Sequence, residues 1–378
     1  MAAGGATLAR GGGSHFRVTG AGAVGVERGI VLSAPNAPQA LLLLRVKHAE
    51  IDHIEVDASN FAAIMCKVDP SSSDCKAGDR RYDGFVMEGI SIHHNHLHDV
   101  VGEGIYLGNS FYRGDSTHYC GNNANCNFAP CGGVQYPHEV RDIHVYENLI
   151  EATGWDGIQI GSAVTGCLVE QNVVRDWGTQ EQSSQNHGIQ VGDGSSCTVR
   201  RNLLVSGGVG MQIAGIGGSL VHDNVIVGHK GFGIYVNPRP TPLPTDIVAQ
   251  GYVGGFVVAQ NTLIAAPNQQ GPALRDINLP GNPVPSGNHL ADNLVVRPGT
   301  GYLQLTPSYG WIVGANMRFA TTAEAGLSGA GTEDFCPDTG SGPVGAGVDL
   351  TALGLTSDFL GGPRPVGAGW DVGALECH

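Results

Sequence analysis

Two acidic residues hold the same place in a phrase that the chain repeats. Glu103 comes directly before GIYLG, and Asp156 comes directly before GIQIG. If the two phrases stack, these residues lie about one strand spacing, ~4.8 Å, apart. That spacing approaches the ~5 to 5.5 Å between the carboxyl groups of a retaining glycosidase, where one carboxylate attacks and the other protonates the leaving oxygen. Repulsion between two close carboxylates separates their pKa values, so we expect one acid and one base.

A second set of residues suits β-elimination beside a uronate carboxyl. This reaction needs a base for the proton and a partner that neutralises the carboxyl. His187 and Tyr106 are the candidate base and acid. The candidate neutralising residues are Gln159, Gln190, Lys230 and Arg239. Hydrolysis is slightly favoured, because an acidic chain with only four lysines suits a polyanion poorly unless calcium bridges the charges.

The phrases belong to a longer repeat that ends in asparagine. The recurring asparagines are Asn95, Asn148, Asn172, Asn202, Asn224, Asn261 and Asn293. Where no insertion intervenes they are 22 to 24 residues apart, a period typical of a solenoid. Apolar residues alternate within each unit, as Ile158 and Ile160 do around Gln159, which indicates strands. Short strands with one apolar face, separated by turns, predict a parallel β-helix whose asparagine amides stack.

These repeats resemble the right-handed parallel β-helix proteins of the pectate-lyase-like superfamily, which include polysaccharide lyases and related glycoside hydrolases. The resemblance covers 90–302 well and 1–89 loosely, and the stretch 358–376 resembles a closing segment of secreted bacterial β-helix proteins. It implies one all-β domain: N-terminal coils at 1–89, central coils at 90–302 with an inserted loop at 109–137, and a C-terminal part at 303–378. The scaffold hosts many activities and therefore does not name a substrate.

Stacked coils convert the repeat into columns of side chains. The isoleucine of each phrase should point inward and the next residue outward, which gives the column Tyr106, Gln159, Gln190, Gln212 and Tyr235. A second column contains Glu103, Asp156, His187, Val209 and Phe232, and a third contains Asn109, Ser162 and Asp193. Amides flanked by aromatic rings suit the hydroxyls and flat faces of an extended sugar chain. The alternative is a solvated or purely stabilising polar ladder.

Insertions follow the same phrases. We expect the loops at 109–137, 178–186 and 238–252 to form the walls of a groove on this face, with Trp155 beside Glu103 and Asp156.

The histidine-rich stretch HHNHLH, which begins at His93, lies beside the ladder asparagine, so a packed or solvated cluster is expected there and no metal site. Calcium remains a possible cofactor, and none is required. GAGAVG at 20–25 lacks the βαβ context of a dinucleotide site.

Composition narrows the partners and the compartment. A net charge of −14 argues against nucleic acid, and no apolar run is long enough for membrane insertion. Nine cysteines favour an oxidising compartment, so a secreted, periplasmic or cell-surface protein that has lost its leader is expected. Disulfides are expected between Cys66 and Cys75 and among Cys120, Cys126 and Cys131. Cys167 and Cys197 share one ladder slot and should form a stacked or bridged pair.

The sequence therefore predicts an exported β-helix that binds an extended polysaccharide across the face from Tyr106 to Tyr235 and cleaves its glycosidic bonds. Hydrolysis by Glu103 and Asp156 is preferred to elimination. A non-catalytic carbohydrate-binding or adhesive surface protein is the third possibility. The sugar, the linkage and the oligomeric state are left open.

Overall fold

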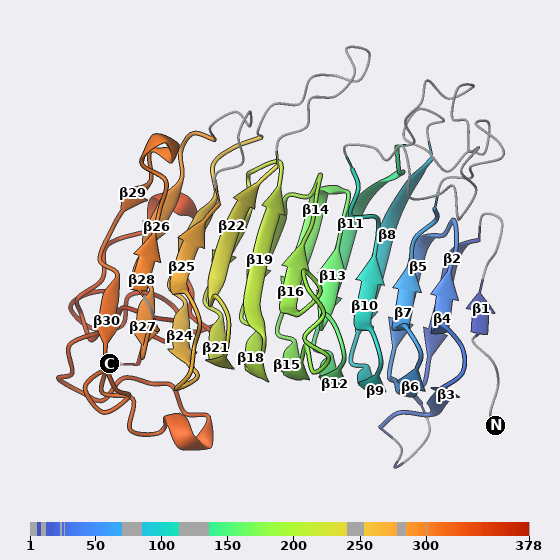
Figure 1. Ribbon diagram of the computed structural model, residues 1–378, viewed down its shortest axis with the longest axis horizontal. Helices are drawn as coiled ribbons and strands as arrows, with labels where there is room; N and C mark the ends of the chain where they lie inside the picture. The colour runs from blue at the N-terminus through green and yellow to red at the C-terminus, as the bar shows by residue number, and fades with distance from the viewer. Residues whose placement is uncertain are drawn as a thin grey trace.

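Three parallel sheets wind around one apolar core in the computed structural model, which describes residues 6–8, 13–22, 25, 27–69, 85–112, 136–239, 253–277, 285–299 and 301–377. Each sheet has ten strands, and every strand pairs with the strands three places before and after it in the chain. The coils lie side by side from β1 at the right of Figure 1 to β30 at the left. This arrangement is a solenoid of stacked three-strand coils.

The strands of each sheet follow in hydrogen-bonded order. Sheet 1 contains β1 (Ala6–Leu8), β4 (Gln39–Leu43), β7 (Ala62–Cys66), β10 (Glu103–Leu107), β13 (Ile158–Ile160), β16 (His187–Val191), β19 (Val209–Gly215), β22 (Ile234–Pro238), β25 (Pro272–Asp276) and β28 (Gly301–Gln304). Sheet 2 contains β2 (Ser14–Thr19), β5 (Lys47–Asp52), β8 (Val86–His93), β11 (Glu139–Tyr146), β14 (Ala163–Glu170), β17 (Cys197–Arg200), β20 (Leu220–His222), β23 (Val257–Ala259), β26 (His289–Ala291) and β29 (Ile312–Val313). Sheet 3 contains β3 (Ile30–Ala34), β6 (Ile54–Ser59), β9 (His96–Val100), β12 (Leu149–Thr153), β15 (Val173–Trp177), β18 (Leu203–Gly207), β21 (Val225–His229), β24 (Thr262–Ala265), β27 (Leu294–Val296) and β30 (Met317–Phe319). In the described residues, short 3₁₀ helices follow the coils or interrupt the last one, namely η4 (Pro307–Tyr309), η5 (Ala330–Thr332) and η6 (Thr351–Leu353).

The glycine that opens each repeated phrase is required by the width of the core. A Cβ added at Gly157 would lie 2.5 Å from Cγ1 of Val174 on sheet 3, and one at Gly188 would lie 2.8 Å from Cδ1 of Leu204. Each distance is far shorter than an ordinary carbon contact. The strands of sheet 1 therefore begin in close contact with the inner side chains of sheet 3. Glycine is needed at this position because a Cβ would clash with those side chains.

The recurring asparagines form one continuous ladder, as predicted. Each Nδ2 donates to Oδ1 of the asparagine on the next coil, for example Asn148 to Asn172 at 2.9 Å and Asn172 to Asn202 at 3.0 Å. The ladder runs one coil beyond the expected end, because Asn293 donates to Asn316 at 2.7 Å. At the other end, the backbone N–H of Ile54 donates to Asn95, and Ile54 itself occupies the ladder slot. These amides satisfy the backbone at a buried turn of each coil from Asn95 to Asn316.

The cysteines confirm one expectation and contradict another. Cys167 and Cys197 are joined by a disulfide, and a second disulfide joins Cys336 and Cys377. Cys66 is a free, buried thiol, so its predicted bond to Cys75 is wrong. Cys66 points into the core from β7 and contacts Sδ of Met87 at 3.4 Å, and burial raises its pKa to about 12. Cys75, Cys120, Cys126 and Cys131 lie outside the described residues.

Residues 320–377, here called the return segment, pack against the outer faces of sheets 2 and 3. Val372, Ala374 and Leu375 cover apolar side chains of β21, β24 and β27, and Trp370 contacts those of β23 and β26. Arg364 is fully buried and pairs with Asp223 at 3.0 Å and with Glu376 at 2.9 Å. The orange and red chain at the left of Figure 1 is this segment.

Two of the expected loops are largely outside the described residues, since 113–135 and 240–252 are not described. Within the described part of the chain, no helix is both long and apolar enough to span a bilayer.

Candidate functional site

The predicted column of outward side chains exists on sheet 1. Strand pairing places Tyr106 beside Gln159, Gln159 beside Gln190, Gln190 beside Gln212, and Gln212 beside Tyr235. The same register continues from Tyr235 to Arg275 and from Arg275 to Gln304. The column follows directly from parallel strands that pair in register one coil apart.

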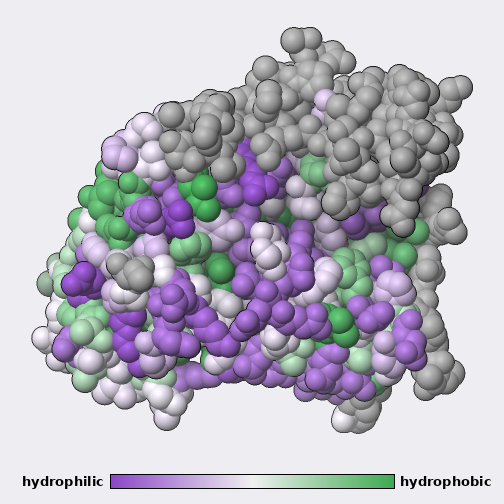
Figure 2. All heavy atoms as spheres, viewed as in Figure 1, coloured by the Kyte–Doolittle hydropathy of each residue, from purple (hydrophilic) through white to green (hydrophobic). Residues whose placement is uncertain are grey.

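A cleft of about 390 Å³ lies along the middle of this column. Six of its lining residues are expected site residues, namely Gln159, Gln190, Asp193, Gln212, Tyr235 and Arg239. The others are Ser110, Ser184, Gln185, Gly192, Asn237 and Ile277. Hydrophilic residues also dominate the middle of the face shown in Figure 2. The cleft walls therefore offer mainly amide, hydroxyl and charged groups, which suit a ligand rich in hydroxyls.

A buried chain of hydrogen bonds links the second column to the cleft. Oδ1 of Asp156 accepts from the backbone N–H of His187 at 2.7 Å and lies 3.0 Å from Nδ1 of the same residue. Nε2 of His187 lies 3.2 Å from the hydroxyl of Tyr235, which donates to Oε1 of Gln212. Asp156 thus fixes the orientation of His187, and His187 contacts a tyrosine of the cleft wall.

Glu103 and Asp156 occupy matching positions on neighbouring coils. The Gly104 N–H donates to the Asp156 backbone oxygen, and Ile105 pairs with Ile158 two residues later. Glu103 is 1% exposed and Asp156 is 0% exposed. Oε2 of Glu103 and Oδ2 of Asp156 are both buried without a hydrogen-bond partner among the described residues. Burial, and then the negative charge of Asp156, raise the pKa of Glu103 well above its ordinary value, which favours the protonated form of this carboxyl.

The four expected catalytic residues do not line the cleft. Tyr106, Glu103, Asp156 and His187 are each more than nine-tenths buried beside it. At Tyr106 the cause is side-chain packing: Phe61 meets it edge to face at 6.1 Å, and Trp155 meets Phe61 at 5.4 Å. Trp155, expected as a binding residue, is half-buried in this aromatic group.

Two further expectations concern cations. Arg239 lies in the cleft and pairs with Asp193 at 3.1 Å. Lys230 is exposed on the turn before Phe232 and does not line the cleft.

Two cations of this face were not anticipated. Nζ of Lys67 lies 4.3 Å from the ring centroid of Tyr106 and 3.1 Å from Asp69. Its positive charge acts on the Glu103 carboxyl and opposes the rise in its pKa. Arg275 stands next to Tyr235 in the column. The alternation of buried Leu274 and outward Arg275 in PALRD was the signal that could have placed it.

The histidine cluster that begins at His93 runs from the end of β8 on sheet 2 into β9 on sheet 3, and its first ring is packed and close to a carboxylate. His93 stacks on Tyr146 at 4.5 Å, and its Nε2 lies 3.1 Å from Glu50. Ligand atoms of Glu50, Asp52 and His93 lie within 4.8 Å of one another, the spacing of a cation site. Arg17 already donates to both oxygens of Asp52 at 2.6 and 2.8 Å, so an arginine supplies the positive charge there.

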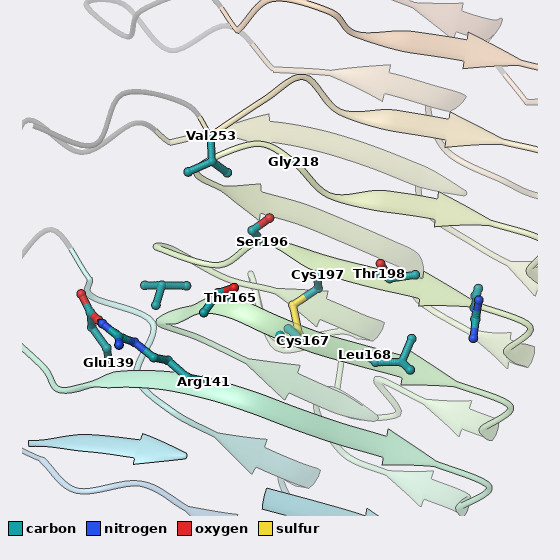
Figure 3. A pocket seen from close by; sticks show the side chains of 13 residues that line it. Glu139, Arg141, Thr165, Cys167, Leu168, Ser196, Cys197, Thr198, Gly218 and Val253 are labelled. Atoms are coloured by element: carbon teal, nitrogen blue, oxygen red, sulfur yellow. Dashed lines mark hydrogen bonds and ion pairs between the residues drawn. A yellow bond between two sulfur atoms is a disulfide. The ribbon is translucent and has the colours of Figure 1, made fainter. Parts of the chain in front are cut away.

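A larger hollow lies on the outer face of sheet 2. It is lined by Glu139, Arg141, Thr165, Ser196, Thr198 and Val253, among others, around the Cys167–Cys197 disulfide (Figure 3). None of the residues expected to act chemically is among its lining residues. The candidate site is therefore the smaller cleft on sheet 1, which contains the expected residues, and not the larger hollow on sheet 2.

The comparisons with known proteins agree with this architecture. Residues 138–293 match a family model described as a right handed beta helix region. The chain is a right-handed parallel β-helix. With the asparagine ladder and the stacked sheets, this match confirms the right-handed parallel β-helix fold expected from the sequence. No curated protein matches the sequence significantly.

Several solved structures align with this β-helix at low similarity. XylC in complex with xylose aligns with 13% identity and a TM-score of 0.40, over 68% of this chain and 38% of that one. The GH136 lacto-N-biosidase from Eubacterium ramulus aligns with 12% identity and a TM-score of 0.35, over 76% of this chain and 51% of that one. Pectate lyase Pel9A aligns with 11% identity and a TM-score of 0.35, over 99% and 87% of the two chains. The chain thus spans 38% and 51% of the first two proteins, and likeness at this level does not identify its substrate.

Proposed function

We propose that this β-helix is a carbohydrate-active enzyme that binds an extended polysaccharide along the sheet 1 cleft and hydrolyses its glycosidic bonds. The observation that carries the proposal is the pair Glu103 and Asp156. Two carboxyl groups on neighbouring coils are buried, each has an oxygen without a partner among the described residues, and the pKa of Glu103 is raised well above its ordinary value. An acid and a carboxylate side by side are the parts that glycoside hydrolysis needs.

The environments of the two groups assign their roles. Glu103, with its raised pKa, donates its proton to the glycosidic oxygen as the bond to the anomeric carbon breaks. Asp156 is held by His187 through Oδ1, which leaves Oδ2 free to form the bond to that carbon. Water then attacks the anomeric carbon, gives a proton back to Glu103 and releases Asp156. This sequence retains the anomeric configuration.

The rest of the face supports a sugar chain. Gln159, Gln190 and Gln212 repeat at the coil spacing, and each primary amide offers both donors and an acceptor to sugar hydroxyls. Tyr235 stands at the end of this row, and its aromatic side chain lines the cleft. Calcium needs about six to eight oxygen ligands. The described pair offers two carboxyl groups beside the Lys67 cation, so calcium does not fit there and has no part in the proposed reaction.

Elimination on a uronate polymer is the second candidate, and one specific contact favours it. The Tyr235 hydroxyl lines the cleft and contacts Nε2 of His187, which Asp156 orients. This chain could take a proton from a sugar carbon and return one to the leaving oxygen. The tyrosine next to His187 is Tyr235, whereas the sequence suggested Tyr106.

A binding protein without turnover would use the same cleft. The two disulfides among the described residues support an exported protein in either case, because such bonds persist in oxidising compartments.

The deciding experiment is incubation with a panel of neutral and uronate polysaccharides. Hydrolysis releases reducing ends without ultraviolet absorbance, whereas elimination produces an absorbing unsaturated uronate. Reducing ends without absorbance, abolished in Glu103→Gln, are the expected result. Absorbance that persists in Glu103→Gln and vanishes in Tyr235→Phe would replace hydrolysis by elimination. Sugar binding without any product would favour the adhesive protein.

A further inference from the structure

Arg275 extends the column beyond the cleft, and no residue of opposite charge in the described part of the chain pairs with it. Strand pairing places it beside Tyr235, and its guanidinium carbon lies 4.9 Å from the ring centroid of Phe232. Its Nε is buried without a hydrogen-bond partner, and no acidic side chain among the described residues pairs with it. A half-buried guanidinium without a counterion has lost hydration and gained no compensating bond.

Two other cations of this face, Arg239 in the cleft and Lys67 beside Tyr106, are neutralised. Arg239 pairs with Asp193 at 3.1 Å, and Lys67 pairs with Asp69 at 3.1 Å. The unmatched positive charge in the column is therefore that of Arg275. A guanidinium is planar, and its N–H groups lie in the one plane that binds carboxylate or sulfate through two bonds.

We propose that Arg275 is an anion-binding subsite, and that the polysaccharide bound in the cleft is therefore acidic, with carboxylate or sulfate groups. This inference rests on the proposed function, because it takes the sugar chain to follow the column. Arg275 lies four coil steps from Gln159, through Gln190, Gln212 and Tyr235. At ~4.8 Å per step the distance is roughly 19 Å. The recognised anion therefore belongs to a sugar several rings away from the bond that Glu103 and Asp156 would cleave.

Binding to an inactive variant separates this subsite from catalysis. In a Glu103→Gln background, affinity would be measured by isothermal titration with polygalacturonate, alginate and chondroitin sulfate. The paired ligands are the carboxyl-reduced forms of the first two and a carboxyl-reduced, desulfated form of the third. At least one acidic polymer should bind, with affinity that falls as salt rises. Adding Arg275→Gln should weaken that binding by about 10- to 100-fold, the effect of a lost charge-assisted hydrogen bond.

Arg318→Gln is the matched control. Arg318 also lies over an aromatic ring, Tyr302 at 6.0 Å, but it is exposed on β30 and does not line the cleft. Arg318→Gln changes the net charge by the same amount as Arg275→Gln, and we expect it to leave the affinity for the polymer unchanged. Equal losses in both variants would reduce the effect to general electrostatics and overturn the subsite.

Three other outcomes also overturn it: equal binding of a polymer and its neutral form, unchanged affinity in Arg275→Gln, and no binding of any acidic polymer. Cleavage of a neutral polysaccharide that Glu103→Gln abolishes would uphold the proposed hydrolysis while rejecting the anionic substrate. Acid-specific binding that depends on Arg275, in a parent protein without turnover, would uphold the subsite and reject the catalysis.

Discussion

Asp156 accepts hydrogen bonds from the same histidine twice, from the backbone N–H of His187 at 2.7 Å and from its Nδ1 at 3.0 Å. Both bonds end on Oδ1, while Oδ2 stays buried without a partner among the described residues. Oδ1 thus bonds to the neighbouring coil, and Oδ2 is available to react with a substrate. Desolvation makes an unpaired carboxylate oxygen reactive, since water no longer stabilises it.

Glu103→Gln and Asp156→Asn should each lower turnover by about 10²- to 10⁴-fold, because an amide keeps the shape and loses the proton chemistry. Substrate affinity should change little. Steady-state kinetics on the substrate found in the panel, together with titration of the inactive variants, separate the two effects. Glu151→Gln is the control, since Glu151 lies on sheet 3 and bonds to His96. Near-normal turnover in both amide variants would remove the assigned roles.

Tyr235→Phe should lower kcat by about tenfold under hydrolysis, because His187 loses one of its two side-chain contacts and holds Asp156 less firmly. KM should stay within a few-fold, since the aromatic ring remains. Under elimination the same change would remove the proton carrier and abolish product formation. Initial rates of the parent and the variant, followed by reducing ends and by absorbance, distinguish the two results.

Protonation of Glu103 should stabilise the fold. Burial and Asp156 raise its folded-state pKa above the unfolded value of about 4.3, so the folded state holds the extra proton. The free energy of unfolding therefore falls as pH rises above about 4.3 toward the folded-state pKa. Glu103→Gln has no carboxyl to titrate and so avoids this loss of stability. The difference in free energy of unfolding between the variant and the parent should therefore grow, in favour of the variant, as pH rises. Thermal melts of both proteins from acid to alkaline pH measure it, and parallel curves would contradict a raised pKa.

Asp292 predicts a second pH effect, on the attachment of the return segment. Burial raises its pKa to about 6, although both carboxyl oxygens accept from the Val348 N–H. The folded state is the better proton binder, so the free energy of unfolding falls as pH rises from about 4 to about 6. Asp292→Asn should flatten the stability profile in this window alone. A variant whose profile matched that of the parent would assign the titration to other groups.

Asn172→Ala should destabilise the protein by about 1 to 3 kcal/mol for each backbone group left unpaired. Asn172 donates to the carbonyls of Val145 and Glu170 and joins the ladder on both sides. Asn316→Ala is the matched change at the half-buried end of the ladder, where fewer buried groups depend on the amide. Denaturant unfolding should therefore show the larger loss at Asn172. Equal losses would mean that position in the ladder does not matter.

The glutamine column could be predicted because Gln159, Gln190 and Gln212 stand in phrases of identical spacing, and in-register pairing turns equal spacing into adjacency. Arg275 was missed because PALRD lacks the glycine frame and follows an insertion, so nothing in its neighbourhood resembles the other phrases. Strand alternation through Ile64 would have placed Cys66 in the core, and local spacing suggested a disulfide instead.

The burial of Glu103 could not be predicted in the same way. Matching slots place Glu103 beside Asp156, which the repeat predicts, but burial depends on side chains contributed by neighbouring coils. The aromatic group of Phe61, Trp155 and Tyr106 joins three successive coils, and Phe61 lies outside any recognisable phrase. A repeat alignment predicts where a residue lies along and around the solenoid, but it does not predict how deeply its side chain is buried.

The buried Arg364 also affects how the solenoid comes apart. A stack of coils that touch only their neighbours loses coils one at a time from its ends. Arg364 joins the return segment to Asp223, several coils before the last one at 301–319. The return segment packs across the final coils and is anchored to Asp223, which lies before them. While the buried Arg364–Asp223 pair is intact, the final coils therefore cannot unfold one at a time. Under a stretching force, the coils between Asp223 and β30 should therefore yield together, as one step in the extension.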